Sequence, residues 1–123
     1  MEKKERKKIL ILENDDFLRE ILGNLLHKKG FYIISEHRIE KGLDESHKQN
    51  IDLVILGTSC FEYEGKETLS LIRKKLGKPN VPFFIINETN SILSFVKKDE
   101  QIANKDLSVQ SIISRVEEIL YTQ

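Results

Sequence analysis

The sequence predicts an α/β fold: a doubly wound, five-stranded parallel sheet with helices on both faces. Short apolar runs alternate with amphipathic stretches five times along the 123 residues, which is typical of repeated strand–helix units. One run, at 51–56, is apolar at nearly consecutive positions, as in a strand that is covered on both faces. The length suits one domain spanning 1–123, in which 1–6 form a charged lead-in.

Five segments are predicted to form the strands. The first four are apolar runs, and the fourth has Pro82 near its start, where a missing N–H does least harm. The fifth is short and more polar, which favours an edge position. The predicted strands are 7–12, 31–35, 51–56, 81–86 and 101–104.

Apolar side chains spaced three and four residues apart predict the helices between these strands. The first helix has Asn14 or Asp15 as a cap at its start and Gly30 at its end. A second clear helix ends near Gly77, and Ser108 caps the last one. Weaker patterns predict helices within 38–50 and 89–98.

The composition excludes several classes of protein. Charged residues make up 33% and hydrophobic residues 39% of the chain, which fits a globular protein. The 20 basic and 20 acidic residues balance, so no overall charge attracts nucleic acid or an anionic membrane. The single cysteine, Cys60, has no partner for an internal disulfide, and a reducing cytoplasm is therefore expected. His27, His37 and His47 lack metal-ligand spacing, and we expect them to be solvated.

The carboxyl ends of the strands are where a doubly wound sheet places its functional residues. Four stretches lead to those ends: "ILILENDDFLREIL", "IDLVILG", "PFFIIN" and "NKDLSVQSIISRV". On these motifs the chain resembles a response-regulator receiver domain from about residue 7 to 120. The resemblance implies the CheY-like, flavodoxin-like three-layer sandwich with strand order 2-1-3-4-5.

The resemblance also implies where a phosphorylation pocket would lie. Receiver domains carry an acidic pair after the first strand, a phosphoacceptor Asp after the third, then a hydroxyl residue and a lysine. The residues at and beside these positions form a degenerate pocket: Glu13, Asn14, Asp15, Gly57, Asn87 and Lys105. Because glycine has no side chain, no acyl phosphate forms at Gly57. We therefore expect no catalysis, no metal and no cofactor, and an ion pair of Lys105 with Glu13 or Asp15.

A receiver scaffold without its nucleophile predicts a pseudo-receiver that acts by phosphorylation-independent protein–protein interaction. The expected partner is another signalling protein: a histidine kinase, an output domain or a regulator. A homodimer stays open, and neither nucleic acid nor a membrane is expected as a direct partner. The residues predicted to contact the partner are Phe61, Tyr63, Lys97, Lys98, Gln110 and Ser114.

Two alternatives remain open at this point. The chain is also compatible with the receiver portion of a larger transcriptional or signalling regulator, controlled by a partner or a ligand. A flavodoxin-type cofactor carrier would share the strand order. It is disfavoured because the carboxylates of "ENDD" (13–16) would repel a phosphate group after the first strand.

Overall fold

The computed structural model describes residues 6–121 except 90 and 92, and it describes the backbone but not the side chain of Lys105. Its five strands form one parallel sheet in the order β2-β1-β3-β4-β5, which confirms the predicted fold class. The strands are β1 (Lys8–Leu12), β2 (Tyr32–Glu36), β3 (Leu53–Gly57), β4 (Phe83–Asn87) and β5 (Gln101–Ala103). The helices are α1 (Asp16–Lys28), α2 (Ile39–Glu45), α3 (Gly65–Leu76) and α4 (Val109–Tyr121).

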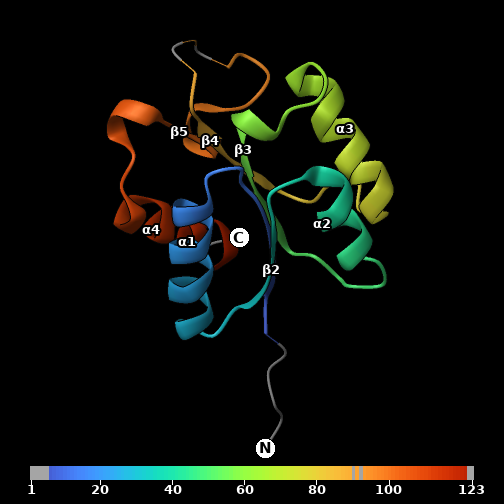
Figure 1. The fold of residues 1–123 in the computed structure, drawn as a ribbon, viewed down its shortest axis with the longest axis horizontal. Helices are drawn as coiled ribbons and strands as arrows, with labels where there is room; N and C mark the ends of the chain where they lie inside the picture. The colour runs from blue at the N-terminus through green and yellow to red at the C-terminus, as the bar shows by residue number, and fades with distance from the viewer. Residues whose placement is uncertain (1–5, 90, 92, 122–123) are drawn as a thin grey trace, which may run out of the picture.

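Two apolar layers enclose the sheet. Figure 1 shows α1 and α4 on one face and α2 and α3 on the other. Successive side chains of a strand point to opposite faces. In β3, Leu53 and Ile55 therefore join the core under α1 and α4, while Val54 and Leu56 join the core under α2 and α3. The consecutive apolar positions of β3 reflect this two-sided burial.

The residues predicted to cap the helices lie at the helix ends. The Asp15 carboxylate accepts a hydrogen bond from the Leu18 N–H at 3.0 Å, so Asp15 rather than Asn14 caps α1. Ser108 caps α4 by accepting from the Ser111 N–H at 3.1 Å. Gly77 ends α3 in the left-handed conformation. None of the described helices combines the length and the hydrophobicity that a membrane-spanning helix needs.

Replacing Ser108 with Ala is expected to lower the free energy of unfolding by about 1 kcal/mol, because the Ser111 N–H loses its acceptor. Urea denaturation measures the change. Ser70, exposed within α3, provides the matched control. If the Ser70→Ala variant loses as much stability as the Ser108→Ala variant, the cap does not account for the effect.

The segment between β4 and β5 departs from the prediction. A helix was expected within 89–98, but the described residues from 88 to 97 form bends and turns, followed by a short 3-10 helix, η2 (Lys98–Glu100). The Phe95 ring lies against Gly65 so closely that a Cβ there would overlap it, and it also contacts the Phe61 ring at 6.3 Å between centroids. Packing against distant parts of the chain therefore overrides the local helical pattern.

Candidate functional site

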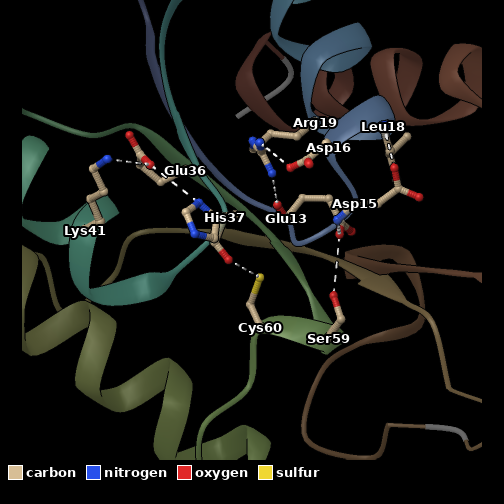
Figure 2. Close-up of polar contacts among 10 residues, drawn as sticks. All are labelled: Glu13, Asp15, Asp16, Leu18, Arg19, Glu36, His37, Lys41, Ser59 and Cys60. Atoms are coloured by element: carbon tan, nitrogen blue, oxygen red, sulfur yellow. Dashed lines mark hydrogen bonds and ion pairs between the residues drawn. The ribbon is translucent and has the colours of Figure 1, made fainter.

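The site lies at the carboxyl ends of β1, β3 and β4. Its first member, Glu13, follows β1 directly and is 0% exposed. The Asp15 N–H donates to Glu13 Oε2 at 2.8 Å, and the Arg19 guanidinium donates to the Glu13 backbone carbonyl at 2.7 Å. Figure 2 shows these contacts at the start of α1, with Ser59 approaching from the opposite side. The end of β1 thus holds a buried carboxyl group in one orientation.

Gly57, the last residue of β3, leaves room for two carboxyl groups. A Cβ at Gly57 would overlap Glu13 Oε1 and would lie 2.5 Å from Glu88 Oε1. Glu88 follows β4 and reaches sideways over Gly57 to the end of β1. Carboxyl groups that follow the two neighbouring strands therefore fill the space over Gly57, where the sequence resemblance placed the acceptor position.

Ser59 connects the two carboxyl groups. It lies in the 3-10 helix η1 (Thr58–Cys60), directly after β3. Its hydroxyl is 3.1 Å from Glu88 Oε1 and 3.5 Å from Glu13 Oε2. The Glu88 backbone N–H donates to the Thr58 hydroxyl at 2.9 Å, which fixes the start of the loop after β4. We call Glu13, Gly57, Ser59 and Glu88 the Gly57 site.

Burial dominates the electrostatics of this site. It raises the pKa of Glu13 from 4.5 to about 7, because a charged carboxylate is poorly solvated there. The hydrogen bond from the Asp15 N–H acts in the opposite direction. The side-chain hydrogen bond with Glu88 and the negative charges of Glu88 and Asp15 raise the pKa further. Glu13 therefore binds a proton near neutral pH.

Cys60 is an unreactive neighbour of the site. Its thiol is buried and donates to the His37 carbonyl at 3.5 Å (Figure 2). Burial, followed by the charges of Glu13 and Glu88, raises its pKa to about 12, so the nucleophilic thiolate is scarce at neutral pH. The three histidines are exposed, in accord with the sequence-based expectation.

The structure brings together only part of the predicted degenerate pocket. Among the six predicted residues, Glu13 and Gly57 meet, whereas Asp15 contributes its backbone N–H and Asn14 is exposed. Asn87 is 4% exposed but turns toward the following loop, where its side chain contacts Thr89, Ser91 and Gln101.

The expected ion pair of Lys105 with Glu13 or Asp15 falls on a side chain outside the described part of the structure. Glu88 is the functional residue that sequence reasoning missed. Its position directly after β4, the strand next to β3, could have indicated a role in the site. The direction of the Glu88 side chain, however, depends on the absence of a side chain at Gly57.

A groove of about 1330 Å³ lies beside this site, between the loop after β4, β5 and the start of α4. Lys98, Gln110 and Ser114, three of the predicted partner-contacting residues, line it together with Arg115. Gln101 supports one wall, because its amide lies 3.1 Å from the Leu93 carbonyl and 3.3 Å from the Val96 carbonyl. The described residues between β4 and β5 form no α-helix, and the groove lies at this edge of the sheet.

The remaining predicted contact residues lie elsewhere. Lys97 is exposed but does not line the groove. Tyr63, before α3, is 57% exposed, as a contact residue requires. Phe61, in the loop before α3, is half-buried, and its ring lies 6.3 Å from the Phe95 ring between centroids. Part of the Phe61 ring therefore packs within the chain, and its contact with a partner stays a prediction.

Sequence comparison with known proteins gives a partial match. No family model matches the chain. The chain is 30% identical over 78 residues to a cyclic di-GMP phosphodiesterase of Thermotoga maritima. The alignment covers 63% of this chain and only 20% of the length of the relative.

Solved receiver structures resemble almost the whole chain. A CheY-like receiver domain protein of Methanospirillum hungatei gives a TM-score of 0.76 at 17% identity, covering 94% of both chains. A response regulator described as putative, from Chloroflexus aurantiacus, gives 0.74 at 19% identity, covering 94% of this chain and 98% of the other. The receiver domain of the hybrid histidine kinase CckA gives 0.71 at 22% identity, covering 92% and 98%. The chain therefore has the CheY-like receiver fold.

Proposed function

We propose that this chain, which has the fold of response-regulator receiver domains, is a pseudo-receiver that binds another signalling protein without being phosphorylated. The arrangement at Gly57 carries the proposal. Phosphoryl transfer to a receiver needs an accessible carboxylate that attacks the donor. Position 57 has no side chain, Glu13 is buried, and Glu88 is turned toward Glu13 and Ser59. Two adjacent carboxyl groups also repel an anionic phosphodonor.

The groove beside β5 is the proposed contact surface. Lys98 and Arg115 place positive charge on its lining, Asp106 adds one negative charge, and Gln110 and Ser114 supply neutral polar groups. Such a lining suits a polar protein surface with acidic side chains. We propose a histidine kinase, an output domain or a regulator in the cytoplasm as the partner, and no enzymatic activity for the chain itself.

One observation favours the alternative in which this chain is the receiver portion of a larger regulator. The aligned segment is 20% of the length of the Thermotoga maritima relative, so a segment similar to this chain occurs there within a longer protein. Under this alternative, the partner surface is an output domain of the same polypeptide. The proposed contact surface is unchanged, but binding is then intramolecular.

A flavodoxin-type carrier fits the site poorly. A phosphate-bearing cofactor is held by backbone N–H groups, hydroxyls and a helix N-terminus. Here Glu13, Asp15 and Glu88 place carboxyl groups around the end of β1, and the Asp15 N–H is already used by Glu13. The charge of this region disfavours an anionic ligand.

Affinity capture tests the proposal. The whole tagged chain is incubated with cytoplasmic extract of its native cells, with and without acetyl phosphate and Mg²⁺, and bound proteins are quantified by mass spectrometry. We expect a signalling protein to be retained equally under both conditions. The Ser114→Glu variant, which introduces negative charge into the groove, is expected to retain about tenfold less, equivalent to about 1.4 kcal/mol.

Ser70→Glu is the matched control, because Ser70 is exposed on α3, on the other face of the sheet. It is expected to bind like the unmodified chain. Retention that requires the phosphodonor would contradict phosphorylation-independent binding. Equal losses in the two variants would show that the groove is not the contact surface.

A further inference from the structure

The Glu13 carboxyl group lacks the donors that a buried carboxylate needs. Its Oε2 atom accepts from the Asp15 N–H, but Oε1 has no hydrogen-bond partner of fixed donor character among the described residues. This unpaired oxygen points into the space over Gly57. A buried, ionised oxygen without a hydrogen-bond donor is strongly disfavoured. The Glu13 carboxyl group is therefore stabilised when it binds a proton or accepts a hydrogen bond from a protonated neighbour.

Glu88 supplies the matching group across Gly57. Its Oε1 atom and Glu13 Oε1 both border the space that a Cβ at Gly57 would fill, and the two side chains are hydrogen-bonded when one of them is protonated. The Ser59 hydroxyl faces both but has a single proton, so it serves one carboxyl group at a time. Two carboxylates in this arrangement repel each other, whereas one proton between them converts the repulsion into a hydrogen bond.

We propose that Glu13 and Glu88 share one proton over Gly57 and thereby form a proton-operated latch at the carboxyl end of the sheet. The protonated pair holds Glu88 inward, across the ends of β3 and β1. When the proton passes to water, the two carboxylates repel each other and Glu88 turns out to solvent. The latch involves this chain alone and operates whether or not a partner binds.

Other charged groups face the pair from the surrounding elements. Asp15, at the start of α1, adds negative charge, and Arg19 on α1 adds positive charge on the backbone side of Glu13. Cys60 on η1 stays neutral, and the Glu36 carboxylate of β2 is engaged by Lys41 at 3.8 Å. From the segment after β5, the backbone of Lys105 is described but not its side chain.

The latch has a defined pH dependence. In the folded chain the pKa of Glu13 is raised to about 7, against 4.5 for an unperturbed glutamate. Between these values the folded state binds more protons than the unfolded state. The contribution of the pair to stability is therefore complete below pH 4.5, falls as the pH rises to about 7, and is lost above it.

Carboxyl ¹³C NMR titration of the labelled whole chain tests the latch. We expect one glutamate carboxyl to titrate with a midpoint near 7, and the Ser59 amide resonance to follow the same midpoint. In the Glu88→Gln variant the midpoint is expected to fall by at least about one pH unit, a tenfold change in proton affinity. The like charge is removed there, and the new amide N–H donates to Glu13. Glu20→Gln, an exposed change on α1, is expected to leave the midpoint unchanged.

A second variant separates the carboxyl titration of the latch from any contribution of the three histidines. In Glu13→Gln the carboxyl titration near 7 and the matching change at Ser59 are both expected to vanish, although His27, His37 and His47 remain. The latch is excluded if no glutamate carboxyl of the unmodified chain titrates above about pH 6. It is also excluded if the Ser59 midpoint persists in Glu13→Gln or the carboxyl midpoint persists in Glu88→Gln.

Discussion

Replacing Gly57 with Asp is expected to lower the free energy of unfolding by about 3 kcal/mol or more at pH 7, measured by urea denaturation. Overpacking of a filled interior position costs about 1–3 kcal/mol, and a third carboxyl group beside two others adds electrostatic repulsion. Both effects act here, because a Cβ alone would overlap Glu13 and approach Glu88. An aspartate at position 57 is therefore expected to destabilise this chain.

Two further variants identify the cause. Gly57→Ala is expected to cost about 1–2 kcal/mol, since it adds the Cβ without the charge. Gly57→Asp combined with Glu88→Ala is expected to recover at least half of the loss, because the second substitution vacates the space. A Gly57→Asp chain as stable as the unmodified one would show that Glu88 does not occupy this position.

Replacing Phe84 with Ala is expected to lower the free energy of unfolding by about 3–5 kcal/mol. Phe84 is fully buried in β4, within the core under α1 and α4, so its truncation leaves a cavity. Phe17→Ala is the matched control, because the Phe17 ring is 75% exposed and its loss is expected to change stability by less than about 0.5 kcal/mol. Similar losses in both variants would contradict the burial of β4 on this face.

The sheet and its helices could be predicted because their signals are local. Strand β3 shows its two-sided burial in consecutive apolar residues, and Asp15, Ser108 and Gly77 mark helix ends through contacts within a few residues. The residue type at Gly57 also showed without coordinates that no nucleophile is present there. Each of these inferences needs only a short stretch of sequence.

The arrangement after β4 could not be predicted because its contacts join distant residues. Glu88 turns over Gly57, 31 positions earlier in the chain (88 minus 57), in response to an absent side chain. Phe95 leaves the expected helical pattern to pack on Gly65 and Phe61. The Gln101 amide donates hydrogen bonds to the Leu93 and Val96 carbonyls of this loop. In a helix, these carbonyls would accept hydrogen bonds from backbone N–H groups of the same helix. Local periodicity contains none of these contacts.

Intact-mass spectrometry of the whole chain after incubation with acetyl phosphate and Mg²⁺ tests the claim that this chain is not phosphorylated, because Gly57 offers no acceptor and carboxyl groups fill the space over it. A receiver domain that retains its acceptor aspartate serves as the positive control in the same mixture. We expect the control to gain one phosphoryl group and this chain to keep its mass of 14.3 kDa. Stoichiometric, acid-labile phosphate on this chain would contradict the claim.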